Sequence, residues 1–100
     1  MELTVTRKVV ALVLAYNEEG SLPGLLAETA RDCPDWSIVV VSDGSTDGSA
    51  KCVRAARAVL LELPFNSGVA AAEQTGFIYA LRSGAAIVVR LDGDGQHPPP

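Results

Sequence analysis

The sequence has too few cysteines and too few positive charges for several classes of protein. Cys33 and Cys52 are its two cysteines, and their spacing gives neither a disulfide framework nor a metal motif. They are interpreted as buried free thiols of a protein in a reducing compartment. Eight Lys and Arg against twelve Asp and Glu leave a net charge of −4, with no basic stripe to neutralise phosphates. We therefore expect no nucleic-acid partner.

Long apolar runs are also missing. The run at residues 9–15 follows Arg7 and Lys8, as in a signal peptide, but polar residues (YNEE) stand where a small-residue cleavage site belongs. No stretch approaches the roughly 20 apolar residues of a membrane span. The run is therefore interpreted as a buried strand of a cytoplasmic protein, which in full length could lie at the inner face of the membrane.

What the chain does have is a regular alternation of strand and helix patterns. Continuous apolar runs predict strands, and helical spacing of apolar residues predicts helices. The predicted strands are residues 9–15, 37–41, 58–63 and 85–91, and the predicted helices are about 21–32, 46–57 and 69–83. This order predicts right-handed crossovers and a parallel sheet. The fold class is therefore three-layer α/β/α, with a mostly parallel, Rossmann-like sheet of four strands and three helices.

The helical spacing also predicts which faces are buried. The second helix is expected to begin with a cap from Thr46 or Asp47, and the third is expected to end at Gly84. Gly76, inside the third helix, predicts close helix–sheet packing. The residues predicted to face the core, with Trp36 beside them, are Leu22, Leu25, Leu26, Thr29, Ala30, Cys33, Ala72, Gly76, Tyr79 and Ala80.

Two aspartates separated by one glycine follow the last strand. Because strand side chains alternate, Asp92 and Asp94 leave the strand on the same side if Gly93 continues the extended geometry. Adjacent carboxylates repel unless a cation lies between them, and their hard oxygens suit Mg²⁺ or Mn²⁺. The alternative is a polar Asp-Gly turn that closes the strand. A calcium loop fits less well, because His97 stands where such a loop needs glycine.

Polar clusters follow all four predicted strands. They lie at residues 16–18, 42–45, 66 and 92–94. Ligands of parallel α/β sheets bind at the carboxyl ends of the strands, so the clusters predict one binding site. The chain lacks Gly-x-Gly-x-x-Gly after the first strand and lacks a Gly-x4-Gly-Lys-Ser/Thr loop, which argues against dinucleotide and P-loop sites.

Each residue of these clusters can also be interpreted as part of the fold, without contact to a ligand. Glu18 and Glu19 could be first-turn acids favoured by the helix dipole. Asp43 could belong to an Asx turn without a ligand, Asp47 could cap a helix, and Asn66 could only hold its loop.

In order and spacing, these motifs resemble the N-terminal half of a family 2, GT-A fold glycosyltransferase, in the branch of the dolichyl- and polyprenyl-phosphate sugar synthases. The resemblance covers about residues 9–98. The motifs that carry it are residues 15–19 (AYNEE), 41–47 (VSDGSTD), 66–68 (NSG) with 74–76 (QTG), and 91–98 (LDGDGQHP). It implies that residues 1–100 form a single domain, the nucleotide-sugar-binding half of a longer enzyme.

The resemblance implies a donor pocket. The backbone around Ala15 and Tyr16, together with Glu18, would line the nucleotide base and ribose. Asp43 would lie beside the base or ribose, and Asn66 is counted with these substrate-binding residues. In this chain Ser42 stands where many relatives have an acid, which puts one base or ribose contact in doubt. Residues 69–71 (VAA) likewise lack the Lys or Arg that many relatives place there against the diphosphate.

The resemblance also implies a metal site. Asp92 and Asp94 would form the family's D-x-D motif and bridge the ribose and diphosphate of the donor through Mg²⁺ or Mn²⁺. Asp94 would be a direct ligand, and Gly93 would let the donor approach the backbone. Gln96 and His97 would shape this loop.

The implied activity is transfer of a sugar from a UDP- or GDP-sugar, as in hexosyltransferases. The acceptor would be a polyprenyl phosphate or a cell-envelope glycan, and the catalytic base is expected beyond residue 100. The alternative is a module that binds a nucleoside diphosphate and cannot turn over. An open edge at the fourth strand would favour self-association.

Overall fold

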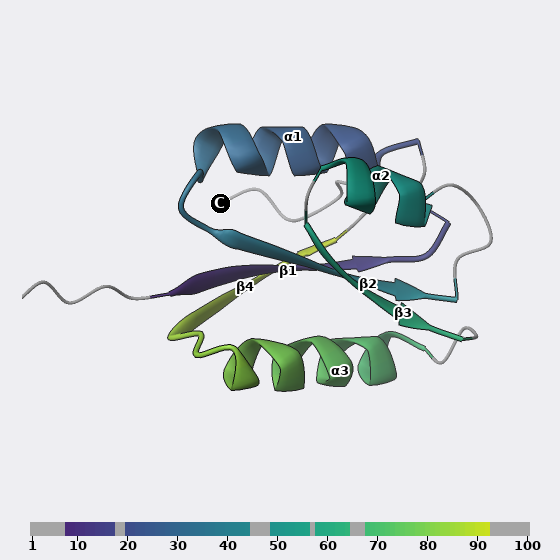
Figure 1. Cartoon of the computed structure of the whole chain (residues 1–100). Coiled ribbons are helices and arrows are strands. Elements are labelled where there is room, and N and C mark those ends of the chain that lie inside the picture. Colours follow the sequence, from purple (N-terminus) through teal and green to yellow (C-terminus); the bar gives the residue numbers. More distant parts are fainter. Residues whose placement is uncertain (1–7, 18–19, 45–48, 57, 65–67, 93–100) are drawn as a thin grey trace, which may run out of the picture.

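The computed structural model describes residues 8–17, 20–44, 49–56, 58–64 and 68–92, with Ser49, Ala50, Cys52 and Asp92 described by their backbone only. Strands and helices alternate along the chain (Figure 1). The elements are β1 (Val9–Ala15), α1 (Leu22–Asp32), β2 (Ser37–Asp43), α2 (Ser49–Ala55), β3 (Val59–Leu63), α3 (Val69–Arg82) and β4 (Ile87–Asp92). The predicted order and number of elements are confirmed.

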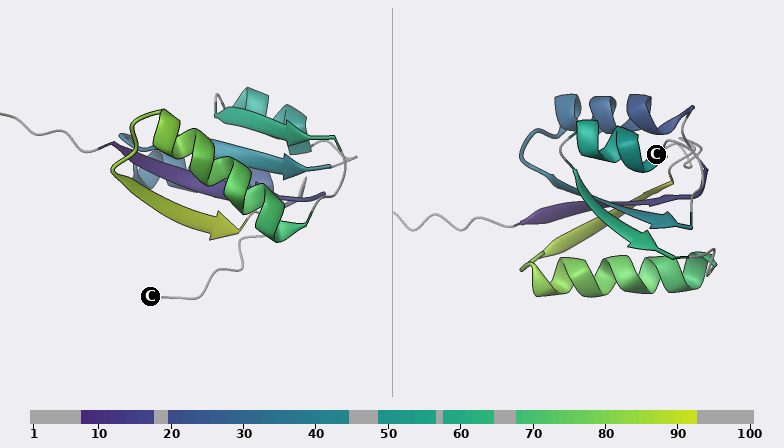
Figure 2. Two further views of the ribbon diagram at one scale, coloured as in Figure 1. Left: turned by 90° about the horizontal axis from the view of Figure 1, so that it is seen from below. Right: turned by 45° about the vertical axis from the view of Figure 1, so that its right-hand side comes forward.

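The four strands form one parallel sheet in the order β3-β2-β1-β4. Helices α1 and α2 cover one face, and α3 covers the other (Figures 1 and 2). The three-layer α/β/α fold class is therefore confirmed. Among the helices that the structure describes, none combines the length and the apolar character needed to cross a bilayer.

Strand β1 is buried on both faces, which explains its unbroken apolar run. Val13 and Ala15 join the cluster beneath α1 and α2, whereas Val10 and Leu12 join the cluster beneath α3. Such a strand needs no polar face, because helices cover the parallel sheet on both sides. The two clusters meet at β1 and β2, and these central strands hold the sheet between the helical layers.

Helix α3 packs on the sheet through a row of small residues. Ala72, Gly76 and Ala80 are buried at spacings of four residues, so they form one row on the helix. A Cβ atom added at Gly76 would lie 3.1 Å from Leu12 Cγ and closer still to both Cδ atoms of that side chain. The predicted close approach of helix and sheet at Gly76 is confirmed.

Two predicted core residues are at the surface instead. Tyr79 is 36% exposed, because the narrow row of small residues leaves large neighbouring side chains at the edge of the contact. Ala30 is exposed, because α1 buries only its stripe from Leu22 to Thr29, and Ala30 borders a cavity. Cys33 is a half-buried free thiol.

Some boundaries also differ from those predicted. Strand β2 continues two residues farther, to Asp43, because it stays paired with β3 as far as Leu63. Helix α2 ends at Ala55. Its expected caps at Thr46 and Asp47 lie outside the described residues.

The end of α3 fixes the start of β4. The N–H of Gly84 donates to the Leu81 carbonyl and that of Ala85 to the Ala80 carbonyl, the two bonds of a Schellman motif. Gly84 has φ +88°, which glycine adopts without steric cost. Lys8 Nζ donates to the Ser83 carbonyl at 3.0 Å, so the predicted helix stop is also held by a cation.

Candidate functional site

The carboxyl ends of the strands lie together at one edge of the sheet. Ala15, the last residue of β1, is in register with Ser42, and Leu14 is in register with Asp92. Asp43 therefore ends β2 on one side of β1, and Asp92 ends β4 on the other. Neighbouring strands are about 4.8 Å apart, so the two chain segments are separated laterally by about 10 Å. Figure 2 shows that all four strands run in the same direction toward this edge.

The segment after β1 is exposed at this edge. Tyr16 is 45% exposed, whereas Ala15 is buried against the cluster beneath α1 and α2. Asn17 has φ +50°, a left-handed conformation that asparagine adopts more readily than most residues. The chain therefore turns sharply after β1, and Tyr16 lies exposed at this edge of the sheet.

Asp43 is the buried acid of the described part of this edge. Its side chain is 6% exposed, and Oδ2 accepts a hydrogen bond from the Gly68 backbone N–H at 3.0 Å. Gly68 is the N-cap of α3. The Gly44 N–H donates to the Ser42 carbonyl, so the chain turns at Asp43. The bond to Gly68 links two segments that are 25 residues apart, and no local sequence pattern indicates it.

Several predicted site residues lie outside the described part of the chain. They are Glu18, Glu19, Asn66, Gly93, Asp94, Gln96 and His97. Asp92 is placed by its backbone at the end of β4. Among the described side chains, no three acidic, histidine or cysteine residues come together as a metal site.

The residue types at the end of β4 suit a divalent cation. A D-x-D pair supplies carboxylate oxygens, which are the ligands that Mg²⁺ and Mn²⁺ prefer, and β4 ends in the first of these aspartates. Mg²⁺ commonly uses one or two protein carboxylates and completes its shell with phosphate oxygens and water. The donor set therefore suits a cation that is shared with a bound diphosphate.

Glu73 forms an ion pair with Arg90. Its Oε2 accepts a hydrogen bond from Arg90 Nη1 at 2.6 Å, which links α3 to β4. Sequence spacing did not indicate this pair, since the two residues lie on different elements.

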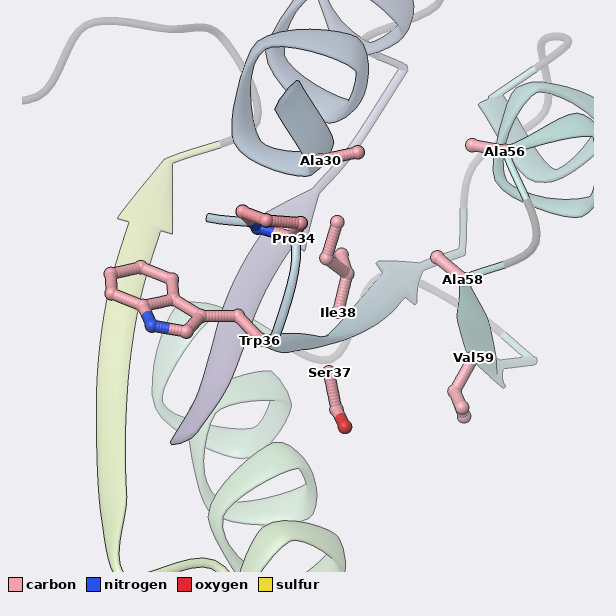
Figure 3. Close-up of a pocket in the computed structure, with 8 residues that line it drawn as sticks. All are labelled: Ala30, Pro34, Trp36, Ser37, Ile38, Ala56, Ala58 and Val59. Atoms are coloured by element: carbon pink, nitrogen blue, oxygen red, sulfur yellow. The ribbon is translucent and has the colours of Figure 1, made fainter. Parts of the chain in front are cut away.

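A cavity of about 280 Å³ lies at the opposite edge of the sheet. It is bordered by the amino ends of β2 and β3, and its lining is mostly small and apolar. Figure 3 shows Ala30 of α1 above Ile38, Ala56 and Ala58 to the right, and the Trp36 ring directed toward β4. Because parallel sheets bind ligands at their carboxyl ends, this cavity is not the candidate site.

The chain matches a known protein family over nearly its whole length. The family model described as glycosyl transferase family 2 matches residues 10–100. The match begins at the second residue of β1 and includes the rest of the sheet and residues 93–100.

Two curated proteins are similar to the chain over nearly its whole length. A polyprenol monophosphomannose synthase from Mycolicibacterium smegmatis is 31% identical over 100 residues, which cover 94% of this chain and 38% of that protein. An undecaprenyl-phosphate 4-deoxy-4-formamido-L-arabinose transferase from Proteus mirabilis is 35% identical over 102 residues, which cover 92% and 30%. The chain thus spans about a third of the length of these relatives.

A solved structure shares the fold. A mannosyltransferase from Pyrobaculum calidifontis, in complex with GDP-Man and Mn²⁺, superposes with a TM-score of 0.69 at 30% identity. The superposition covers 91% of this chain and 28% of that one. The sheet and helices described above therefore correspond to the GT-A arrangement of such enzymes.

Proposed function

Because this chain belongs to glycosyl transferase family 2, we propose that it forms the donor-binding part of a sugar-transferring enzyme. The observation that supports the proposal is that the ends of β1, β2 and β4, with Tyr16, Asp43 and Asp92, share one carboxyl edge of a GT-A sheet. Residues 1–100 then make up one domain, the nucleotide-sugar-binding half. The catalytic base belongs to a further part of the enzyme.

In this proposal the donor is a UDP- or GDP-sugar that lies across the end of β1. Ala15, Tyr16 and Glu18 line its base and ribose. Asp43 and Asn66 belong to the same pocket. The similarity to a mannosyltransferase solved with GDP-Man supports a nucleotide sugar as the ligand.

The cofactor in this proposal is Mn²⁺ or Mg²⁺, held by Asp92 and Asp94. When bound, such a cation neutralises the charge that develops on a nucleoside diphosphate leaving group. Gly93, without a side chain, allows the diphosphate to approach the backbone. The similarity to a mannosyltransferase solved with GDP-Man and Mn²⁺ supports a divalent cation as the cofactor.

For the acceptor we propose a polyprenyl phosphate. The names of both curated relatives contain a polyprenol or undecaprenyl phosphate, which supports a lipid phosphate over a cell-envelope glycan. An enzyme that uses a cytoplasmic nucleotide sugar and a lipid phosphate would work in the cytoplasm, at the inner face of the membrane. Transfer requires a base close to the acceptor oxygen, which is expected outside this chain.

Calorimetric titration with GDP-mannose and UDP-glucose, with Mn²⁺ or with EDTA, tests the proposal. We expect one of the two nucleotides to bind with a Kd between about 1 μM and 1 mM, a range typical of enzyme substrates. We expect EDTA to weaken that binding at least tenfold, because the cation bridges protein and diphosphate. Binding of neither nucleotide in the presence of Mn²⁺ would contradict the proposal.

A second measurement separates the enzyme from its alternative, a module that binds a nucleoside diphosphate without turnover. Release of nucleoside diphosphate in the presence of polyprenyl phosphate reports transfer. Transfer by residues 1–100 would show that the chain carries its own base. Binding without transfer would favour the binding module for this chain, with catalysis left to the longer enzyme.

We also propose self-association through β4. In the part of the chain that the structure describes, β4 pairs with β1 alone, and Ile87 at its start is 44% exposed. An open strand edge with apolar side chains is a template for pairing with another copy. Sedimentation velocity should show dimers that increase with concentration. A single monomeric boundary at every concentration would contradict this proposal.

A further inference from the structure

The outer side of α3 carries apolar residues where a surface helix normally carries charged and polar ones. Ile78 and Leu81 lie opposite the buried row of small residues, with Phe77 beside them, because each residue turns the helix by about 100°. Leu81 is 68% exposed, Ile78 is 44% exposed, and Phe77 is also exposed. In Figure 1, α3 is the outermost layer on its side of the sheet. A contiguous apolar face of this kind indicates an interaction surface.

The accessible charges on this side of the described structure are positive. Arg82 is exposed on the last turn of α3, and Lys8 is exposed at the same end of the helix, where it donates to a main-chain carbonyl. Glu73 of α3 is neutralised by its ion pair with Arg90. Asp43, beneath the amino end of α3, is buried. The apolar face is therefore bordered by two cations that have no acidic partner among the described residues.

The exposed acids of the described structure lie elsewhere. Glu28 and Asp32 belong to α1, Asp35 lies between α1 and β2, and Glu62 is paired with Arg54 of α2. Helix α3 itself, with a diameter of about 10–12 Å, separates its outer side from the sheet and from the helices beyond. This distance exceeds the Debye length of about 8 Å at physiological ionic strength. The net negative charge of the chain is therefore largely screened from anything that approaches α3 from outside.

The size of this face favours a lipid surface over a second copy of the chain. A stable protein interface takes about 20–30 residues from each partner. The outer side of a 14-residue helix supplies far fewer. A bilayer needs no complementary protein surface, because apolar side chains enter the boundary between headgroups and acyl chains while neighbouring Lys and Arg attract anionic lipids. Both kinds of side chain are present here.

We propose that the outer side of α3 lies on the surface of an anionic bilayer. Phe77, Ile78 and Leu81 then enter the boundary between headgroups and acyl chains. Lys8 and Arg82 contact the anionic headgroups. This inference rests on the proposed function, because a polyprenyl phosphate acceptor is itself a lipid of the bilayer. The amino end of α3 lies at the carboxyl edge of the sheet, so a helix that lies flat on the bilayer brings the candidate site close to the lipid phosphates.

Cosedimentation with phosphatidylcholine vesicles, with and without phosphatidylglycerol, tests the proposal. We expect the anionic vesicles to bind the parent protein about 25-fold more tightly, because each of the two cations contributes about fivefold. The double variant Ile78→Gln/Leu81→Gln should bind them about tenfold or more weakly, since two apolar side chains no longer enter the bilayer. Glutamine adds no charge and favours helix, and circular dichroism verifies the fold. Equal binding of parent and double variant would overturn the proposal, as would failure of the parent to bind.

Ile87→Gln is the matched control. Ile87 is 44% exposed, as Ile78 is, but it lies on the other side of the sheet, because its neighbour Val88 packs toward α3 and strand side chains alternate. It should bind vesicles within about twofold of the parent protein, because it buries no area in the bilayer. A loss as large as that of the double variant would show that α3 is not the surface involved. Arg82→Gln should weaken binding to anionic vesicles about fivefold and leave binding to neutral vesicles unchanged.

Two further measurements identify other occupants of this face. If the double variant dissociates an oligomer in sedimentation velocity and binds vesicles as the parent does, α3 packs on a second copy and the proposal is wrong. If, in a longer form of the enzyme, the same variant lowers the Tm and leaves vesicle binding unchanged, another segment covers α3, and the proposal is again wrong. The nucleotide titration is decided separately. Vesicle binding through α3 without nucleotide binding would refute the proposed function alone, and nucleotide binding without vesicle binding would refute only the lipid surface.

Discussion

Replacing Gly76 with valine is expected to lower the Tm by about 12–24 °C. The new Cβ would fall among the terminal atoms of Leu12, which is fully buried between α3 and the sheet. Overpacking of this kind costs about 3 kcal/mol, and the two methyl groups of valine add to the overlap. In a domain of this size, each kcal/mol corresponds to about 4–8 °C in Tm. Thermal unfolding followed by circular dichroism measures the effect.

Gly24 provides a matched control in another helix. It lies in α1, is exposed, and has nothing within 4 Å of an added Cβ. Gly24→Val should be neutral or slightly stabilising, because valine is the better helix former. The double variant Leu12→Ala/Gly76→Val should be at least about 1 kcal/mol more stable than the sum of the single effects predicts, since one change makes room for the other. Strict additivity would show that the clash at Leu12 is not the cause.

Replacing Asp94 with alanine is expected to abolish nucleotide binding that depends on Mn²⁺. Residues that merely orient metal ligands contribute about 10- to 100-fold to affinity, so the loss of a proposed ligand should cost about 100-fold or more. Titration of the variant with Mn²⁺ and the preferred nucleotide measures the change. The fold should be retained, because Asp94 follows the last strand of the sheet.

Two comparisons make this result interpretable. EDTA added to the parent protein should reproduce the affinity of Asp94→Ala, because either change removes the metal contribution. Asp35→Ala, at the opposite edge of the sheet, should bind as the parent protein does. A variant at Asp94 that keeps its Mn²⁺-dependent affinity would reject the metal assignment and, with it, the main chemical argument for a diphosphate donor.

The sheet could be predicted from the sequence, because the burial of a strand determines its pattern of apolar residues. Strand β1 is covered on both faces, so its apolar run is continuous and its limits at Val9 and Ala15 were predictable. The row formed by Ala72, Gly76 and Ala80 was predictable for the same reason. Tyr79 was misjudged, because helical spacing identifies the centre of a buried face but not its width.

The site was less predictable than the fold. The carboxyl ends of parallel strands must share one edge, so the grouping of Asp43 with Asp92 follows from topology. The bond from Gly68 to Asp43 and the pair of Glu73 with Arg90 depend on how a helix lies on the sheet, which periodicity does not specify. The expected roles of Glu18, Asn66 and Asp94 remain predictions.

The position of β1 between β2 and β4 has a consequence for the assembly of the sheet. Val9 pairs with Ile87, so one side of β1 finds its neighbour only after residue 87 has been synthesised. Contacts between segments so far apart carry a large loop-closure entropy and slow the folding of a domain. During synthesis, the edge of β1 therefore stays open until β4 has left the ribosome, and in that interval this edge is exposed to pairing with the wrong chain.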